Sequence, residues 1–593
     1  MTRRRIRLNF QGSRIYNRQT FSCCFIVFAR RWRRMLHRVR FCVCFLIIVG
    51  ATLILASSAA AQEPPSPQAE PVVSRPAEPD AAPSAEQPAS SAENAIPAPE
   101  EPAIPPQRVI PLGLCEVVAR ALASNLDIAV ERFVPDIRDS EVLIAKGEFD
   151  PIFRVDYSYS EAEVPQSSVE GLATSAGTTE THENELTGSL FGKLISGAEY
   201  NLVFDRQFSQ FIRHDAFDPV LGPLGTIEDP WEYVLDTYVE VTQPLLRDFG
   251  LNANLAGIRI ARAQRSISLY DFRQNVIDII AEVQRAYWNL VLAIENLRVT
   301  ENSLVLARDL LRENRIRLEV GTMSVLEVIE AEAGVAQREE GVIVSRSLVK
   351  DAEDNLKRLL NLSRDSDEWN VIIVPTDKPV ILEEEFSLSD QIEIALENRP
   401  DYKSSLTQVE SDRINVQFAR NQTLPVVDML GRYEFQAVDN DLNNALDDIG
   451  TGESPSWQAG LTLEYPIGNR AAKGNYEAAR LTEQQSMLVS ENLRLLIIVD
   501  VRQAIRSIET SLKSIQASRK TTEFSQRSLE AEQKKLEVGI STSHDVLEFL
   551  DALIDAQRRE AIARVNYRLA LVNLAAATGT ILERSNIVIN EEF

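Results

Sequence analysis

The chain has 593 residues, of which 44% are hydrophobic and 25% are charged, and its formal net charge is −25 at pH 7. Such a negative charge disfavours nucleic acid as a partner, since phosphate backbones bind basic surfaces. Four of the five cysteines lie within the first 61 residues. A chain without this segment contains only Cys115, so packing and assembly, rather than disulfides, must stabilise it.

The first 61 residues are typical of a secretory signal peptide. They contain 12 arginines and no acidic residue, followed by an apolar run over residues 41–55 and three alanines before Gln62. An uncleaved anchor is the alternative, but the run is shorter than the ~20 residues of a membrane-spanning helix. The basic region before the run is unusually long, so we expect translation to begin at Met35. Cleavage removes the 12 positive charges and changes the net charge from −25 to −37.

Residues 62–111 form a second distinct segment. They hold 14 of the 27 prolines, set among Ala, Ser and Glu, with few large apolar side chains. A segment of this composition cannot bury a core, so we predict a disordered, extended spacer.

The remainder of the chain is a tandem repeat. The sequence Leu-Glu-Val-Gly at 318–321 recurs at 536–539, and apolar residues recur around both copies at intervals of three and four. This periodicity indicates long helices that each bury one face, as in antiparallel coiled coils. We predict a first repeat at residues 112–362, a linker at 363–385, a second repeat at 386–580 and a C-terminal tail at 581–593. The expected helices are residues 112–147, 252–318 and 322–361 in the first repeat and 387–421, 470–536 and 542–578 in the second.

Between the helices, several stretches alternate apolar and polar residues with a period of two. Aromatic and aliphatic residues take every second position from Trp457 to Tyr465 and from Phe153 to Tyr159. A soluble sheet on a core is the alternative, but the length of the stretches suits membrane-spanning strands and their second face is too polar for a core. Open strand edges are not stable in lipid, so several chains must share one barrel. The predicted strands are residues 151–160, 184–194, 198–208 and 234–243 in the first repeat and 426–438 and 456–466 in the second.

Each strand region leads into a long helix through a proline, Pro244 in the first repeat and Pro466 in the second. Proline cannot donate to a sheet ladder and suits the beginning of a helix. Its recurrence at equivalent places predicts two strand-to-helix junctions.

These features together resemble the TolC-type outer-membrane efflux family. The residues that carry the resemblance are Val538-Gly539, the stretch from Asp545 to Glu548, and an alanine-rich helix with Tyr567 and Asn573-Leu574 that closes at Gly579. The resemblance implies a mixed α and transmembrane β fold. In that fold, three chains share one β-barrel and one periplasmic α-helical barrel, with two to four strands from each repeat.

The first repeat contains an additional hairpin-like stretch at residues 186–208, which turns at Ser196-Gly197 between longer loops at 161–183 and 211–231. This stretch indicates a variant branch of the family with an extended strand region. A chain with six strands gives a trimer barrel of 18 strands, whereas the four strands of the family give 12, and the sequence leaves both open.

The resemblance also implies a narrow periplasmic aperture at the helix tips. Asp545 and Glu548 match the family's acidic aperture positions, and Glu327 is the equivalent in the first repeat. Leu536 and Ser541 stand where the best-studied members have a Tyr and an Arg that hold the gate closed. Threefold symmetry would bring six carboxylates to one axis and favour cations. The tip turns are implied to contact an adaptor protein through Val320, Gly321, Thr322, Val538, Gly539 and Ile540.

The expected function is a passive outer-membrane channel of an efflux or type I secretion system in a Gram-negative bacterium, with a large periplasmic part. Its expected partners are two copies of itself, outer-membrane lipid, a periplasmic adaptor and an inner-membrane pump. No catalytic, cofactor or metal motif is present, and His544 is expected to be an exposed turn residue. The alternatives are a coiled-coil adaptor, which needs one hairpin and Gly-rich strands, and a structural spacer, which needs no amphipathic strands.

Overall fold

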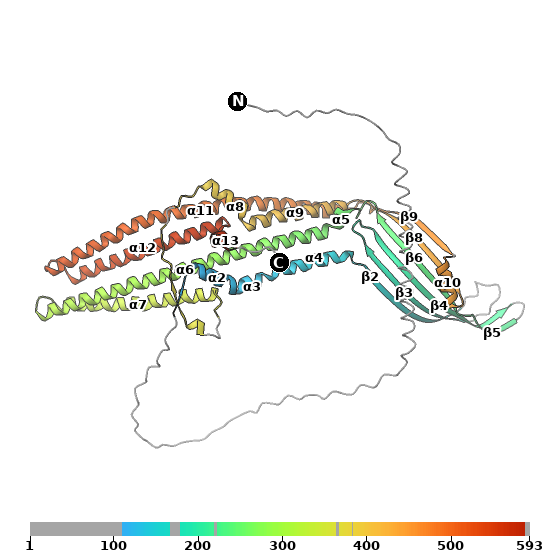
Figure 1. The fold of residues 1–593 in the computed structure, drawn as a ribbon, viewed down its shortest axis with the longest axis horizontal. Helices are drawn as coiled ribbons and strands as arrows, with labels where there is room; N and C mark the ends of the chain where they lie inside the picture. The colour runs from blue at the N-terminus through green and yellow to red at the C-terminus, as the bar shows by residue number, and fades with distance from the viewer. Residues whose placement is uncertain are drawn as a thin grey trace, which may run out of the picture. The chain divides into compact units, whose positions relative to one another are not determined.

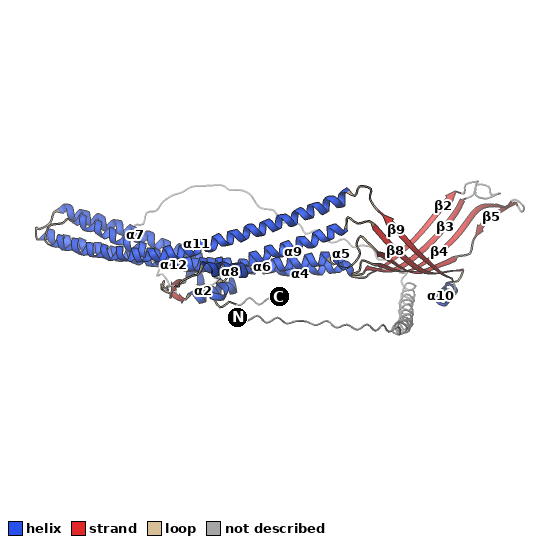
Figure 2. Ribbon diagram, turned by 90° about the horizontal axis from the view of Figure 1, so that it is seen from above, coloured by secondary structure: helices blue, strands red, loops and turns tan. Residues whose placement is uncertain are grey.

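The structure is a computed structural model of the full chain, and it describes residues 109–587 except 166–177, 219–221, 363–366, 382–383 and 453. The predicted signal peptide, the spacer up to residue 108 and the last six residues of the predicted tail lie outside the described residues. Within the described part, all long helices lie together and the large sheet lies at one end of them (Figure 1; Figure 2).

Two helical hairpins dominate the fold, one from each repeat. α6 (Ala256–Glu319) returns as α7 (Val325–Leu359), and α11 (Arg470–Glu537) returns as α12 (Ser543–Ala577). α6 has 64 residues and α11 has 68, so each is about 100 Å long at 1.5 Å per residue. In each hairpin the returning helix has 35 residues. It therefore covers only about half of the long helix, and the other half packs against a different helix.

A shorter helix lies end to end with each returning helix and packs along the remaining part of the long helices. α12 and α9 (Pro400–Asn421) lie one after the other between α11 and α6, while α7 and α4 (Phe133–Lys146) lie along the other side of α6 (Figure 1). In each repeat, one long helix thus packs against a returning helix and, farther along, against a shorter helix. Within the described part of the chain, no helix has both the length and the apolar character needed to cross a membrane.

The large sheet is antiparallel, with the strand order β2-β3-β4-β6-β8-β9. The first four strands come from the first repeat and the last two from the second, and the short β5 (Gly222–Glu228) pairs with β4. The strands are β2 (Ile152–Pro165), β3 (Thr178–Lys193), β4 (Glu199–Asp218), β6 (Glu232–Pro244), β8 (Val426–Asp439) and β9 (Pro455–Glu464).

The register of the sheet sorts its residues onto two faces of opposite character. One cross-strand row is apolar throughout and contains Phe153, Leu190, Leu202, Val239, Tyr433 and Trp457. The next row, on the opposite face, contains Arg154, Ser189, Val203, Tyr238, Glu434 and Ser456. The polar face carries its own interactions, since the Arg432 guanidinium lies 3.7 Å from the Tyr238 ring centroid and 3.1 Å from a carboxylate oxygen of Glu434. Because Trp457 on the apolar face of β9 is 77% exposed, that part of the face is not covered by a core within one chain.

A small two-stranded parallel sheet lies beside the helices, where β1 (Val109–Leu112) pairs with β7 (Ile372–Pro375). It packs on the middle of α6, where Tyr287 and Trp288 are buried. The Tyr287 hydroxyl donates to Asp377 Oδ2 at 2.8 Å, and the same carboxylate oxygen accepts from Leu114 N at 2.6 Å. These bonds fasten the linker between the repeats to α6.

The structure differs from the sequence prediction at 112–147, which we expected to be one helix. Residue 112 ends β1, and the segment after it is divided into α2 (Leu114–Ser124), α3 (Leu126–Glu131) and α4. The cause of the first break is Asn125, whose side-chain oxygen accepts from the backbone nitrogens of Asp127 and Ile128 while its amide donates to Leu359 O. A capping side chain held by α7 therefore interrupts the helix.

Other segments also differ from the prediction. The predicted helix 387–421 is divided at Arg399 into α8 (Leu388–Asn398) and α9, because Pro400 begins the second helix. The expected linker contains β7, and the expected tail contains the short α13 (Ile581–Arg584). The two predicted loops hold strands: β2 and β3 extend into 161–183, and the end of β4 and β5 lie within 211–231. A further helix, α10 (Leu442–Thr451), lies between the two strands of the second repeat and covers Leu235 and Ala437 of the sheet.

Candidate functional site

The free ends of the two hairpins are built alike. Gly321 and Gly539 have φ angles of 73° and 77°, a conformation that favours glycine. Thr322 N donates to Arg317 O at 2.9 Å, and Ile540 N donates to Lys535 O at 2.9 Å, so both long helices end in a Schellman motif. The side chains of Val320, Val538 and Ile540 are exposed.

Each returning helix begins with a hydroxyl cap at the equivalent position. Ser324 Oγ accepts from Glu327 N at 3.4 Å in the first repeat. In the second, Thr542 and Asp545 form a capping box, with Asp545 N donating to Thr542 Oγ1 at 3.3 Å and Thr542 N donating to Asp545 Oδ2 at 3.1 Å. The sequence patterns Ser-x-x-Glu and Thr-x-x-Asp thus fix where α7 and α12 begin.

Two of the residues that the sequence analysis predicted at the aperture, Asp545 and Ser541, form local hydrogen bonds at the hairpin tip. Asp545 Oδ2 also accepts from Thr542 Oγ1 at 2.7 Å and Ser541 Oγ at 3.4 Å. Hydrogen bonds from Thr542 hold the pKa of Asp545 below its ordinary value. The pKa of Glu532 is also lowered, mainly by a hydrogen bond from Ser541 and secondly by one from Lys535. Both carboxylates stay ionised at neutral pH, whereas Glu548 is exposed on α12.

Leu536 contributes to packing rather than to a polar gate. It is buried in an apolar cluster that contains Leu310 of α6 and Val546 and Leu550 of α12. Its backbone oxygen accepts a 3.0 Å hydrogen bond from Arg317 Nη1 of α6. The tip of the second hairpin is thus joined to the first through both its side chain and its backbone.

Further polar links between the hairpins were missed by the sequence analysis. Arg338 of α7 is buried, and its Nη2 lies 2.7 Å from Asp551 Oδ1 of α12 while its Nε donates to Ser303 Oγ of α6 at 3.1 Å. Asn314 of α6 is fully buried and donates to Ser543 Oγ of α12 at 2.8 Å. A signal was present for Asn314, because it continues the three-and-four spacing of Ala307 and Leu310 and so interrupts an apolar seam.

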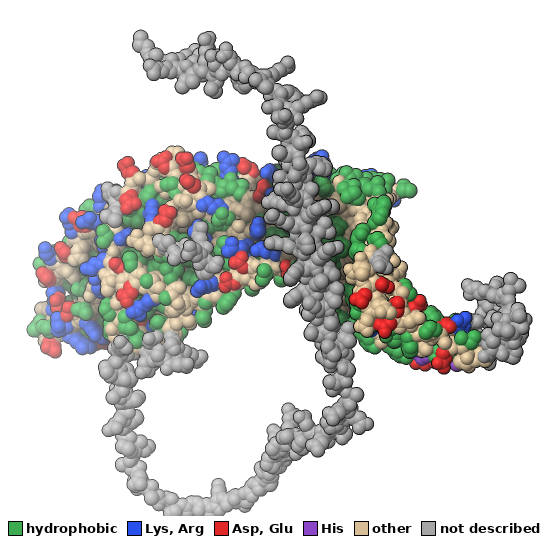
Figure 3. All heavy atoms as spheres, turned by 45° about the vertical axis from the view of Figure 1, so that its right-hand side comes forward, with side chains coloured by type: hydrophobic (Ala, Val, Ile, Leu, Met, Phe, Trp, Pro, Cys, Tyr) green, Lys and Arg blue, Asp and Glu red, His purple; other side chains and the backbone are tan. Residues whose placement is uncertain are grey.

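The two predicted proline junctions lie at the boundary between sheet and helices. Pro244 is the last residue of β6, and Leu245 N donates to Val427 O at 2.7 Å across to β8. Pro466 follows β9, and its backbone oxygen accepts from Asn469 N at 3.1 Å. Asn469 has a φ of 45° and its side chain donates to Thr423 O at 3.0 Å. Hydrophobic side chains gather at this boundary, whereas charges of both signs spread over the helices and Asp and Glu side chains appear on the visible part of the sheet (Figure 3).

The fold of paired helical hairpins joined to a two-faced antiparallel sheet is similar to that of solved outer-membrane channels. The chain is similar to the CmeC outer membrane channel of Campylobacter jejuni, with a TM-score of 0.57 and 18% identity over 80% of this chain and 90% of that one. It is similar to VceC of Vibrio cholerae, with a TM-score of 0.57 and 14% identity over 79% of this chain and 96% of that one. At these identities the likeness concerns the fold.

Sequence comparison extends the likeness to a family. The model of the family described as "Outer membrane efflux protein" matches residues 235–362 and 391–580, which together are more than half of the chain. The chain therefore belongs to this family of outer-membrane efflux channels. The outer membrane protein TolC of Vibrio cholerae is 24% identical over 335 residues, covering 56% of this chain and 73% of that protein. The resemblance to the TolC-type family predicted from sequence is confirmed.

Proposed function

We propose that three copies of this chain form a passive duct that spans the outer membrane and the periplasm and completes an efflux or type I secretion system. The observation that carries the proposal is the register of the sheet, which brings apolar residues from both repeats onto one face across six strands. β9 has 10 residues, so it spans about 34 Å along its axis. A tilt of about 40° reduces this to about 26 Å, close to the apolar band of a membrane barrel.

The strand count supports a barrel shared between chains. β2 and β9 lie at the two ends of the strand path, and among the described residues neither has a second neighbour. Six alternating strands leave β2 and β9 running in opposite directions, so β9 of one copy can pair antiparallel with β2 of the next. Three copies supply about 18 strands, within the range of known membrane barrels.

The helices support the same assembly. At the edge formed by α11, Leu488, Val489 and Leu495 are exposed, and at the opposite edge Leu143 of α4 and Ile343 of α7 are exposed. Exposed apolar side chains in such numbers are typical of an interface. In a ring of three copies, the α11 edge of one copy would pack against the α4 and α7 edge of the next. Both edges would then be buried in the wall of a periplasmic tunnel.

The exposed Val320, Val538 and Ile540 at the hairpin tips suit contact with a periplasmic adaptor, which in turn would join the duct to an inner-membrane pump. The energy for export then comes from the pump, and the chain itself carries out no chemistry. Asp545, Glu548 and Glu327 remain our proposed acidic ring at the aperture. The function of a coiled-coil adaptor or spacer does not require a sheet with one apolar and one polar face, so the sheet favours the channel over these alternatives.

Native mass spectrometry of the detergent-purified protein tests the assembly. We expect a trimer of the mature chain, because the two open sheet edges need partners in an apolar medium. A stable monomer in mild detergent that still binds to liposomes would contradict the shared barrel.

A further inference from the structure

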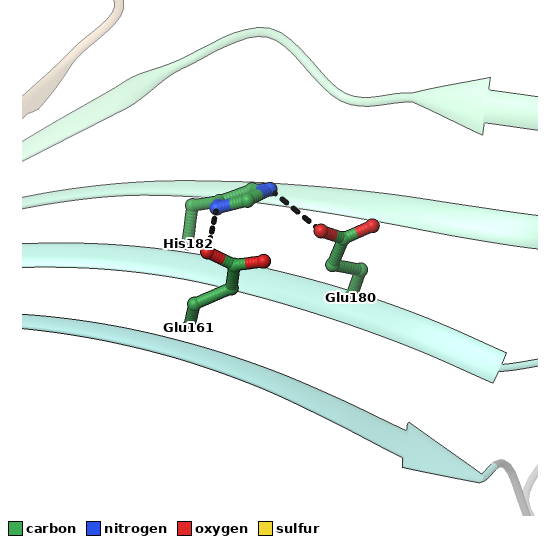
Figure 4. Close-up of side chains that lie close together, drawn as sticks. All are labelled: Glu161, Glu180 and His182. Atoms are coloured by element: carbon green, nitrogen blue, oxygen red, sulfur yellow. Dashed lines mark ion pairs between the residues drawn. The ribbon is translucent and has the colours of Figure 1, made fainter.

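A cluster of imidazole and carboxylate groups lies at the far end of the sheet from the helices. Glu161 of β2 and Glu180 and His182 of β3 lie on the same face, and their side chains point toward one another (Figure 4). His182 Nε2 lies 3.1 Å from Glu180 Oε1, and His182 Nδ1 lies 4.0 Å from Glu161 Oε2. One potential ligand atom from each of the three residues lies within 4.8 Å of the others.

A fourth group adjoins the cluster from β4. His214 Nε2 lies 3.2 Å from the second oxygen of Glu180, so the Glu180 carboxylate bridges two imidazoles. The chain has four histidines, at positions 37, 182, 214 and 544. Two of the three that follow the predicted signal peptide therefore meet at one carboxylate, on two neighbouring strands.

In the described part of the chain, neither Lys nor Arg compensates the charge of the carboxylates in this cluster. Among the described residues, no Lys or Arg lies within ion-pair distance of Glu161 or Glu180; Arg213 on β4 pairs instead with Asp229. Glu163 lies directly across the strand pair from Glu180, and like charges at such positions destabilise a sheet. A bound cation would remove this repulsion.

The strands also hold these groups in place. β2, β3 and β4 are hydrogen-bonded in continuous register through this region, so Glu161 and His182 are direct cross-strand partners. The Tyr159 hydroxyl lies 3.3 Å from His182 Nδ1. If Nε2 carries a metal, Nδ1–H can donate to this oxygen, which is the usual way in which a metal-bound imidazole is oriented.

We propose that Glu161, Glu180 and His182, with His214 as a fourth ligand, bind a divalent transition-metal cation of the zinc class. Imidazole nitrogen together with carboxylate oxygen favours Zn²⁺, Ni²⁺ or Cu²⁺ over Ca²⁺ and Mg²⁺, which prefer oxygen ligands. Bonds of ~2.0–2.2 Å in a tetrahedral site place ligand atoms about 3.4 Å apart, so small side-chain rotations bring Glu161, Glu180 and His182 into range, and His214 lies against the second oxygen of Glu180. The cation would tie β2, the strand at the open edge, to β3 and β4.

Calorimetric titration of the chelator-treated, full-length protein in detergent with Zn²⁺ tests the proposal. We expect one Zn²⁺ per chain, with little competition from a hundredfold excess of Ca²⁺ or Mg²⁺. His182→Asn should weaken Zn²⁺ binding by at least the ~10–100-fold that loss of an outer-shell partner causes at a metal site, and Glu180→Gln, which keeps the shape of the side chain, should do the same. His544→Asn is the matched control and should bind as the unaltered chain does.

X-ray absorption of the Zn²⁺-loaded protein gives a second readout, in which imidazole scattering should be present and should diminish in His182→Asn. Unchanged Zn²⁺ affinity in both His182→Asn and Glu180→Gln, with the assembly intact by native mass spectrometry, would overturn the site. Displacement of Zn²⁺ by equal Ca²⁺, or absorption spectra without imidazole, would equally overturn it, since the cation would then be held by carboxylates alone.

Discussion

Replacing Asp551 by Asn should loosen the contact between the two hairpins. Arg338 is 6% exposed and donates to Asp551, to Ser303 Oγ and to Gly334 O, so its guanidinium is held between α6, α7 and α12. Asp551→Asn removes the negative charge but keeps a side-chain oxygen that can accept from Arg338 Nη2. The buried guanidinium then loses its charged partner while its other two hydrogen bonds remain.

The expected magnitude follows from the exposure of the pair. Removing one partner of a fully buried ion pair costs about 3–5 kcal/mol, whereas exposed pairs contribute about 0–1 kcal/mol. Asp551 is 56% exposed, so water screens much of the attraction and about 1 kcal/mol is the appropriate figure. This corresponds to about a fivefold change in an equilibrium constant. If opening requires α12 to separate from α7, the ratio of open to closed states should rise about fivefold.

Open probability of single channels in planar bilayers measures this effect. The matched control is Glu301→Gln, which removes the carboxylate of an exposed pair with Arg346 within the first hairpin and should leave the open probability unchanged. An Asp551→Asn channel that opens no more often than the control would refute the idea that this link resists separation of the hairpins.

Four further predictions follow from single residues. Leu461→Arg on the apolar face of β9 should destabilise the protein in liposomes by about 2–4 kcal/mol, whereas Thr462→Arg on the polar face should be tolerated; equal urea midpoints for the two would contradict the assignment of the faces. The pKa of Asp545 is lowered in the folded protein, so its contribution to the free energy of unfolding should be complete above the ordinary Asp pKa and lost as the pH falls through the lowered value. Thr542→Val should raise the pKa of Asp545, which carboxyl NMR of the Asp-labelled protein measures. Tyr287→Phe removes the donor to Asp377 and should lower the free energy of unfolding in urea by about 1.5–3 kcal/mol. A change near zero would mean that this hydrogen bond does not stabilise the attachment of the linker to α6. Glu548→Gln should reduce cation preference measured as a reversal potential, without altering the capping box in which Asp545 takes part, and unaltered selectivity would place Glu548 outside the aperture.

The sequence was most informative where structure is set by local periodicity. The Leu-Glu-Val-Gly repeat marks both hairpin tips, because a glycine with positive φ is needed where each long helix ends. The alternating stretches around Phe153 and Trp457 correspond to strands whose register joins them in one apolar row. Both patterns express a repeating geometry that a run of neighbouring residues is enough to reveal.

Features that depend on distant pairing could not be read from the sequence. Asn125 interrupts a predicted helix because Leu359, 234 residues away, accepts from its side chain. β1 pairs with β7 across a similar distance, so neither strand has a local signal. The link from Arg338 to Asp551 depends on which faces of α7 and α12 meet, and the group of Glu161, Glu180 and His182 depends on strand register. The acidic aperture depends on contacts between copies, so that assignment stays a prediction.

Single-channel conductance of the purified protein in planar bilayers tests the central claim most directly. A shared barrel whose polar face lines the lumen predicts discrete conductance steps that favour cations, and Leu461→Arg, but not Thr462→Arg, should reduce the number of channels inserted. A trimer that inserts into bilayers without conducting, under applied potentials of either sign and in the Asp551→Asn variant as well, would contradict the account of this chain as an export duct.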